Sequence, residues 1–197
     1  MRGIFIVLDG PDASGTTTHA KLLADRLKAS GRAVLLTAEP TDGPLGNEIR
    51  AALKNGKSDP MVLQHLFTRD RAWHVDNVIE PALKNGKIVV CDRYWYSTIV
   101  YAEAQGLDVS ELKKLNRKFI QPSCVIFTLP PLDVAIGRLE KRRFREMFED
   151  AELQRKVHAR YAMFARGDQS IHVIDTSNAV ETAAGEIWKV ARATIEP

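Results

Sequence analysis

The sequence has no long hydrophobic run and very few cysteines. The longest apolar run near the N-terminus, Ile4 to Leu8, is far too short to span a bilayer. No charged region followed by a hydrophobic stretch marks a secretion signal there. Cys91 and Cys124 lie in apolar, strand-like surroundings, so we expect reduced core residues rather than a disulfide framework. These features predict a cytoplasmic protein that does not bind a membrane.

Charge of one sign is also scarce. The formal net charge is +3 over 197 residues, and acidic residues are interspersed throughout. A nucleic-acid-binding protein would more often present one basic face with stacked aromatic rings, so no nucleic-acid partner is expected. The densest basic run, RLEKRRFR from Arg138 to Arg145, is broken by Glu140 and followed by further acidic residues. This pattern favours a local anion site over a long phosphate track.

No internal repeat, linker or low-complexity tract divides the chain, and short apolar runs alternate with longer helical patterns along its whole length. Apolar runs without in-out alternation are typical of parallel strands that are covered on both faces. They lie at Ile4–Leu8, Ala33–Thr37, Ile88–Cys91, Cys124–Leu129 and Ile171–Ile174. The sequence therefore predicts an α/β fold, a three-layer sandwich with a five-stranded parallel sheet.

Helical patterns occur between several of these runs. A first amphipathic helix is expected to end near Gly31. Asp59 and Pro60 are good N-cap and first-turn residues for a long helix that runs towards Pro81. Further helices are expected at Ser110–Phe119, Leu132–Lys141, Ala151–Ala165 and Val180–Ile195.

The stretch FIVLDGPDASGTTTHAKLL, from Phe5 to Leu23, has the outline of a phosphate-binding loop between a strand and a helix. Gly10, Gly15 and Thr17 occupy their places in the pattern G-x-x-x-x-G-K-[ST], but Thr16 replaces the lysine. Backbone N–H groups of such a loop, with the helix N-terminus, form an anion site suited to polyphosphate. The alternative is a glycine-rich turn that binds no phosphate. The residues expected to bind the nucleotide are Gly10, Pro11, Asp12, Ala13, Ser14, Gly15, Thr16 and Thr17.

Two charged residues, Asp92 and Arg93, directly follow the third apolar run. Ligands of open α/β sheets bind beyond the carboxyl ends of the strands, so both side chains are expected to face the crevice. Arginine can bind a phosphate through two parallel hydrogen bonds, and aspartate can hold Mg²⁺ directly or through water. The hydroxyl of Thr17 is a second candidate ligand for that ion. The alternative is a surface ion pair.

Phe67 and Arg71 are four residues apart and therefore share one face of the predicted long helix. An aromatic ring and a guanidinium in this arrangement can stack on a nucleobase and bond its carbonyl edge. A phenylalanine on a helix is more often a core residue, which is the alternative.

Together these three elements resemble the thymidylate kinases, a branch of the nucleoside-monophosphate kinases. The matching segments follow in the expected order, namely LDGPDASGTTT, AEPTDGPLG, LFTRDRAWHVDNVIEPALKNG, CDRYWYSTIVYA and RLEKRRFREMFED. The Asp-Arg-Tyr and Phe-x-x-x-Arg motifs are specific in this arrangement, and the loop is less so. The resemblance implies a single kinase domain of the P-loop NTPase type over residues 1–197, with the P-loop at 10–17 and a small helical lid at about 138–150.

The activity that the resemblance implies is phosphorylation of dTMP to dTDP with ATP and Mg²⁺, in dTTP synthesis. A kinase for another deoxynucleotide or a deoxynucleoside is one alternative. Because the loop lysine is missing, a catalytically silent nucleotide-binding protein is another. The helix that begins at Pro60 has more apolar positions than one face needs, and with the resemblance this predicts a homodimer. These positions are Leu63, Leu66, Val75, Val78 and Ile79.

The resemblance also assigns roles to individual residues. Asp12 matches a carboxylate that faces the 3′-hydroxyl of the acceptor, Arg93 a clamp on the acceptor phosphate, and Tyr101 a ring that crowds the 2′ position. Arg50 is expected to replace an arginine that the family often carries beside its Glu-Pro dipeptide. The residues implied for dTMP are Asp12, Glu39, Pro40, Arg50, Phe67, Arg71, Arg93, Ser97, Thr98 and Tyr101.

The arginine-rich lid resembles that of the family branch in which the lid supplies the catalytic cations. Arg138 precedes the lid and is expected to join the P-loop in binding ATP. Thr17 and Asp92 are the implied Mg²⁺ ligands. The implied catalytic residues are Asp12, Asp92, Arg93, Arg142, Arg143 and Arg145.

Overall fold

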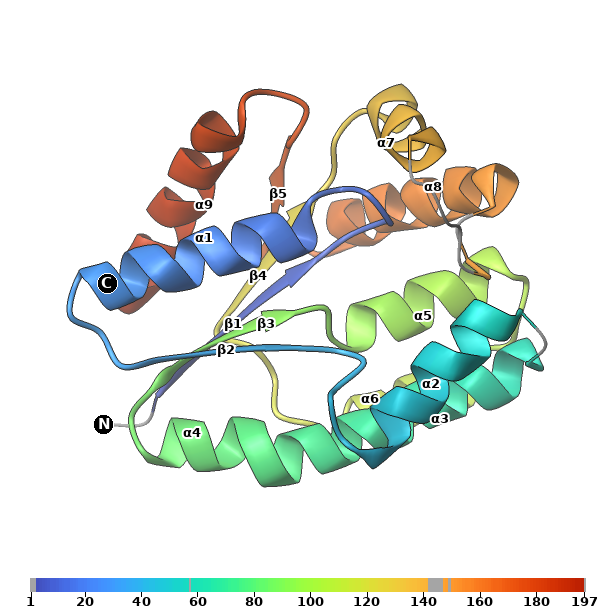
Figure 1. Cartoon of the computed structure of the whole chain (residues 1–197), viewed down its shortest axis with the longest axis horizontal. Coiled ribbons are helices and arrows are strands. Elements are labelled where there is room, and N and C mark those ends of the chain that lie inside the picture. The colour runs from blue at the N-terminus through green and yellow to red at the C-terminus, as the bar shows by residue number, and fades with distance from the viewer. Residues whose placement is uncertain (1–2, 57, 142–146, 149, 197) are drawn as a thin grey trace.

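A computed structural model describes residues 3–56, 58–141, 147–148 and 150–196 of the chain. Within these ranges one parallel sheet runs through the molecule in the strand order β2-β3-β1-β4-β5 (Figure 1). The strands are β1 Ile4–Asp9, β2 Val34–Ala38, β3 Ile88–Asp92, β4 Cys124–Thr128 and β5 Ile171–Ile174. Each of the five predicted apolar runs is a strand whose bounds lie within one residue of the prediction.

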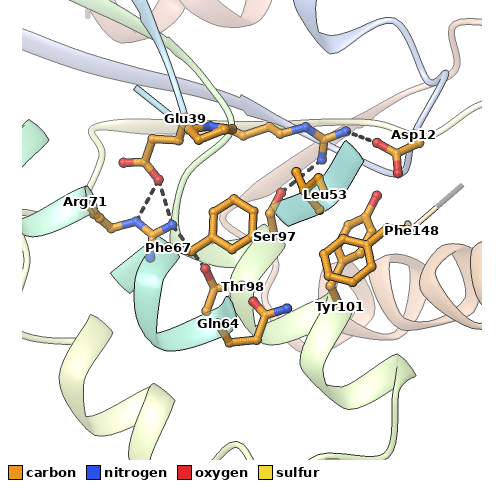
Figure 2. A pocket seen from close by; sticks show the side chains of 12 residues that line it. Asp12, Glu39, Leu53, Gln64, Phe67, Arg71, Ser97, Thr98, Tyr101 and Phe148 are labelled. Carbon is orange, nitrogen blue, oxygen red and sulfur yellow. Dashed lines mark hydrogen bonds and ion pairs between the residues drawn. The ribbon is translucent and has the colours of Figure 1, made fainter. Parts of the chain in front are cut away.

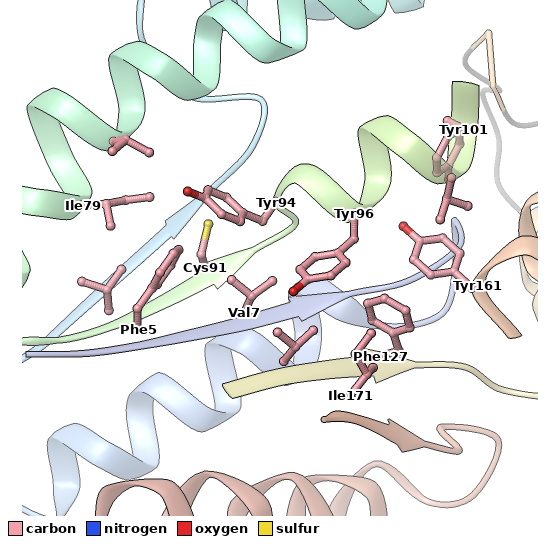
Figure 3. Close-up of a cluster of buried hydrophobic side chains, with 14 of the residues drawn as sticks. Phe5, Val7, Ile79, Cys91, Tyr94, Tyr96, Tyr101, Phe127, Tyr161 and Ile171 are labelled. Carbon is pink, nitrogen blue, oxygen red and sulfur yellow. The ribbon is translucent and has the colours of Figure 1, made fainter. Parts of the chain in front are cut away.

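The strands alternate their side chains between two separate cores. In β1, Phe5 and Val7 contribute to one core and Ile6 and Leu8 to the other. All residues of β3 and β4 are buried, which explains why their sequences show no polar alternation. Figure 3 shows the first core, in which the ring of Phe5 packs edge-on against Tyr94 in the turn before α5. The predicted α/β sandwich with a five-stranded parallel sheet is confirmed.

Two helices cover one face of the sheet and the others lie on the opposite face or at its end (Figure 1). Residues of α1 and α9 build the second core, and those of α2, α3, α5 and α8 belong to the first. The helices are α1 Thr16–Ala29, α2 Pro44–Asn55, α3 Pro60–His74, α4 Glu80–Lys84, α5 Trp95–Ala104, α6 Ser110–Asn116, α7 Leu132–Glu140, α8 Ala151–Gly167 and α9 Val180–Ile195.

The long helix that begins at Pro60 is not uniformly α-helical. Its predicted N-cap is confirmed, because the Asp59 carboxylate accepts hydrogen bonds from the amides of Met61 at 2.9 Å and Val62 at 3.0 Å. A π-helical segment, η1 (Val75–Ile79), separates α3 from α4. Pro81 has no N–H to donate into the preceding turn, and a widened turn accommodates this missing bond.

Most of the apolar side chains that seemed to exceed one helix face pack against other parts of the same chain. Leu63, Val75 and Ile79 are buried in the first core. Val62 and Trp73 remain exposed, at 56% and 37% of their surface. The homodimer therefore stays a prediction that rests on fewer exposed apolar residues than the sequence pattern indicated. Among the described residues, no helix is long and apolar enough to cross a membrane.

Candidate active site

The loop between β1 and α1 borders a wide cavity at the carboxyl end of the sheet, which we call the loop cavity. Gly15 has a φ of 91°, a backbone conformation that favours glycine. At Gly10 a Cβ atom would lie 2.4 Å from the carbonyl oxygen of Thr128, so the loop passes too close to β4 for any side chain. The residues that line the loop cavity are Asp12, Ala13, Gly15, Thr16, Thr17, Thr18, His19, Arg93, Arg138, Thr176 and Val180.

Thr16, at the position of the missing lysine, is buried and lines this cavity. Arg138 lies nearby, where its Nη2 donates to the carbonyl of Thr176 at 2.6 Å and its Nη1 to that of Ala13 at 3.5 Å. Burial, and secondarily the charge of Arg138, lowers the pKa of His19, which is therefore mainly neutral at pH 7. Among the described residues, Arg93 and Arg138 are the arginines that line the loop cavity.

Thr17 and Asp92 form a pair suited to a hard cation. The Thr17 hydroxyl donates to Asp92 Oδ2 at 2.5 Å. Asp92 Oδ1 is buried and has no hydrogen-bond partner among the described residues. Mg²⁺ is usually held by one or two protein oxygens together with substrate phosphates, and this pair fits that pattern. No group of three or more histidine, cysteine, aspartate or glutamate side chains within the described residues could hold a metal ion without a substrate.

Arg93 lies in a turn at the end of β3 with a φ of 69°. Its amide donates to the carbonyl of Leu8 at 2.8 Å, which ties the turn to β1. The guanidinium donates from Nη1 to the carbonyl of Gly10 at 2.8 Å and from Nη2 to Asp12 Oδ1 at 2.7 Å. The left-handed turn thereby directs the side chain across the end of β1 onto the loop.

The buried carboxylate of Asp9 stabilises this turn through hydrogen bonds. Its carboxylate accepts hydrogen bonds from the amide of Tyr94 at 3.0 Å, the hydroxyl of Ser97 at 2.6 Å and the phenol of Tyr161 at 2.7 Å. Burial raises the pKa of Asp9, although Arg93 and these donors act in the opposite direction. The sequence analysis did not identify Asp9 or Tyr161 as site residues. For Asp9 the available signal was its position as a charged residue at the end of an otherwise apolar strand.

A second pocket, which we call the inner pocket, opens between α2, α3 and α5 (Figure 2). Asp12 and Arg93 line it as well, so the two side chains border both cavities. The residues that line the inner pocket are Asp12, Glu39, Pro40, Leu53, Gln64, Phe67, Arg71, Arg93, Ser97, Thr98, Tyr101 and Phe148.

Arg71 is almost completely buried and its guanidinium is held from several sides. Glu39 Oε2 accepts from Nε at 2.9 Å and from Nη2 at 2.6 Å. Nη1 donates to Asn116 Oδ1 at 2.5 Å, and Nη2 donates to the Thr98 hydroxyl at 3.2 Å. The other oxygen of Glu39 lies 3.0 Å from His74 Nδ1. This network holds the edge of the guanidinium in place beside Phe67.

Gln154 connects α8 to the loop. Its Nε2 donates to Asp12 Oδ2 at 2.7 Å, and its Oε1 accepts from the amide of Asp12 at 3.2 Å. The same Nε2 lies 3.3 Å from the phenol oxygen of Tyr101. Burial raises the pKa of Tyr101 well above its usual value, so the phenol stays protonated. Sequence reasoning missed Gln154, because a glutamine on an amphipathic helix carries no distinguishing pattern.

The structure brings most of the expected site residues together in these two cavities. Gly10, Pro11 and Ser14 are buried within the loop and do not line either one. Arg50 also lies away from the lining, because its guanidinium donates to the carbonyl of Pro40 at 3.0 Å and to Asn47 at 2.9 Å. Arg142, Arg143 and Arg145 lie outside the described residues.

Comparison with known proteins agrees with this geometry. The family profile described as thymidylate kinase matches residues 8–187. A probable thymidylate kinase of Thermococcus kodakarensis is 39% identical, with 93% of this chain and 95% of the relative covered. A probable thymidylate kinase of Pyrococcus abyssi is 40% identical, with 95% of each chain covered. A thymidylate kinase of the bacterium Syntrophotalea carbinolica is 37% identical, with 93% of each covered. The resemblance is confirmed, and the chain belongs to the thymidylate kinase family.

Proposed function

We propose that the chain transfers the γ-phosphoryl group of ATP to dTMP, giving dTDP and ADP. The observation that carries this proposal is the Asp12–Arg93 pair, which borders the loop cavity and the inner pocket at once. Phosphoryl transfer requires the donor and acceptor phosphates to meet in line with their charges neutralised. A guanidinium at the junction of two cavities meets that requirement.

The loop cavity is the proposed ATP site. Backbone N–H groups of the loop and the N-terminus of α1 would bind the phosphates. Thr17 and Asp92 would hold Mg²⁺, which when bound supplies charge neutralisation at the β and γ oxygens. Arg138 would border the nucleotide on the side of Thr176.

The inner pocket is the proposed dTMP site. Phe67 offers a ring for stacking on the base, and Arg71 has one N–H donor left for a ring carbonyl. Tyr101 lines the same pocket beside Gln154, and its ring would occupy the space of a ribose 2′-hydroxyl. Arg93 would bind the acceptor phosphate, and Asp12 would face the sugar hydroxyl.

The missing lysine requires another cation during transfer. Arg93 and Arg138 already donate to protein oxygens, so we assign the additional charge to Arg142, Arg143 or Arg145 of the proposed lid at about 138–150. A cation that reaches the phosphates only when a lid closes acts in a site from which water is excluded, where its effect is larger. The homodimer and the cytoplasmic location remain predictions.

A comparison of acceptors tests the assignment of the inner pocket. The rate of ADP release would be measured with dTMP, dUMP, dCMP and thymidine at fixed ATP and Mg²⁺. We expect dTMP to give the highest kcat/KM, because Arg71 donates to a carbonyl that cytosine lacks and Arg93 requires a phosphate. A preference for dCMP or for thymidine would instead support the alternative of another deoxynucleotide or deoxynucleoside kinase.

A further inference from the structure

Gln64 is a buried side chain whose polar atoms are left unpaired. It lies on α3 one turn before Phe67 and on the same face as Arg71, and 1% of its surface is exposed. It lines the inner pocket together with Phe67 and Arg71, as Figure 2 shows. Neither Oε1 nor Nε2 has a hydrogen-bond partner among the described residues of the chain. An unpaired buried amide destabilises a fold, so its retention calls for a reason.

The carboxylates and the guanidinium groups of the inner pocket are already engaged, whereas the Thr98 hydroxyl accepts from Arg71 and keeps its own hydrogen. Both oxygens of Glu39 are bonded to Arg71 and His74, and those of Asp12 to Arg93 and Gln154. A guanidinium has five N–H donors, and the hydrogen bonds of Arg71 to Glu39, Asn116 and Thr98 use four of them. Arg71 can therefore offer one donor to a ligand and no acceptor. Gln64 is the carboxamide that still offers both.

A pyrimidine-2,4-dione presents an N–H donor between two carbonyl acceptors. The free donor of Arg71 can bind one carbonyl, but N3–H needs an acceptor that Arg71 lacks. We propose that Gln64 determines base specificity in the acceptor pocket, with Oε1 accepting from N3–H and Nε2 donating to the adjacent ring carbonyl. This inference rests on the proposed function, because it takes the inner pocket to be the acceptor site.

Gln64 and Arg71 have different parts in this recognition. A carboxamide can rotate by half a turn and exchange its donor with its acceptor, so Gln64 alone could also pair with cytosine. Arg71 cannot exchange its donor, and therefore rejects the amino group of cytosine at the same position. Gln64 adds binding energy, and the two side chains together select a base in which N3–H lies beside a ring carbonyl.

Replacing Gln64 by methionine removes both polar atoms at nearly constant shape. Because unpaired buried polar atoms disappear, we expect the melting temperature of the free protein to stay unchanged or rise by about 2–4 °C. The KM for dTMP should nevertheless rise about tenfold, while the KM for ATP stays unchanged. Gln121→Met is the matched control, since Gln121 is exposed and lines neither cavity. We expect wild-type constants for this control.

A base analogue tests the hydrogen bond itself. In 3-methyl-dTMP the N3–H donor is replaced by a methyl group, so the wild type should use this analogue at least about tenfold less efficiently than dTMP. In Gln64→Met the ratio of efficiencies between dTMP and 3-methyl-dTMP should become smaller, because the variant has no Oε1 acceptor that the methyl group would leave unpaired. A wild type that accepts both equally, or an unchanged ratio in the variant, would overturn the inference.

The failure of this inference can be distinguished from failure of the proposed function. If the wild type phosphorylates dTMP and Gln64→Met keeps its KM for dTMP, Gln64 is a structural residue and the kinase assignment stands. If the wild type shows no turnover with dTMP, the proposed function itself fails and the base-reading role of Gln64 fails with it.

Discussion

The Asp12 carboxylate accepts a hydrogen bond from the Arg93 guanidinium at 2.7 Å, and both side chains line the loop cavity and the inner pocket. Each partner is held on its other side, Asp12 by Gln154 and Arg93 by Gly10. Both side chains are therefore oriented before any ligand arrives. Such preorganisation lowers the reorganisation that a transition state would otherwise require.

Removal of the Arg93 side chain should abolish useful turnover. In Arg93→Ala the acceptor phosphate loses a charge-assisted contact, and we expect transition-state binding to weaken by about 2–4 kcal/mol. This corresponds to a loss of roughly 30- to 1,000-fold in kcat/KM for dTMP. The exposed Arg117→Ala serves as a control for the loss of one positive charge. Wild-type kinetics in Arg93→Ala would remove Arg93 from this role.

Tyr101 should discriminate against ribonucleotides through the space that its ring fills. Tyr101→Ala is expected to narrow the ratio of kcat/KM between dTMP and its ribonucleotide counterpart by roughly tenfold. Tyr101→Phe keeps the ring and loses only the hydroxyl near Gln154, so the ratio should stay close to that of the wild type. If the alanine variant keeps the wild-type ratio, the steric explanation is wrong.

Asp9 should give stability an uncommon pH dependence. Burial raises its pKa above the ordinary value of 3.8. The folded state therefore binds a proton at a higher pH than the unfolded state does. The contribution of Asp9 to stability is complete below the unfolded pKa and is lost as the pH rises through the folded pKa. We expect the free energy of unfolding of the wild type, relative to Asp9→Asn, to increase between about pH 7 and about pH 4.

Urea denaturation of the wild type and of Asp9→Asn across this pH range measures the difference between their free energies of unfolding. The contributions of the other carboxylates are the same in both proteins and cancel in the difference. Asp108→Asn provides a control of opposite sign. Hydrogen bonds from Ser110 lower the pKa of Asp108, so its contribution should be lost as the pH falls. A difference for Asp9 that stays flat or decreases towards low pH would show that burial does not dominate at this carboxylate.

Much of the fold follows from periodicity alone, but two helices were not predicted. Helix α5 was not predicted, because seven of its ten residues are buried and no polar face marks a helical period. Helix α2 was also missed, although Ile49 and Leu53 are buried at helical spacing and Pro44 lies at its start. The helical spacing was present there but was not recognised.

The candidate site was predictable where residues directly follow strands or share one helix face. Asp92 ends β3 and Arg93 follows it, and Phe67 and Arg71 share α3, so local spacing was sufficient. Gln154 joins the site from α8 across 142 positions of sequence, and no local pattern reports such a contact. Arg50 shows the reverse case, since a suitable charge in the expected region is engaged by its own neighbours.

The arginines of the proposed lid should be essential because Thr16 carries no charge. Among Arg142→Ala, Arg143→Ala and Arg145→Ala, we expect at least one to reduce turnover by about 3 kcal/mol, or more than 100-fold. Adding Thr16→Lys to that variant should partly restore turnover if both side chains supply the same charge. If the triple variant keeps full activity, the charge comes from elsewhere in the molecule.

Release of ADP by the wild-type chain, measured in a coupled assay with ATP, Mg²⁺ and dTMP, tests the central claim most directly. The loop amides and the dipole of α1 do not depend on the side chain of residue 16, so nucleotide binding should persist without the lysine. We predict ADP release that depends on dTMP. A protein that binds ATP yet releases no ADP when dTMP is added would contradict the account and support a catalytically silent nucleotide-binding protein.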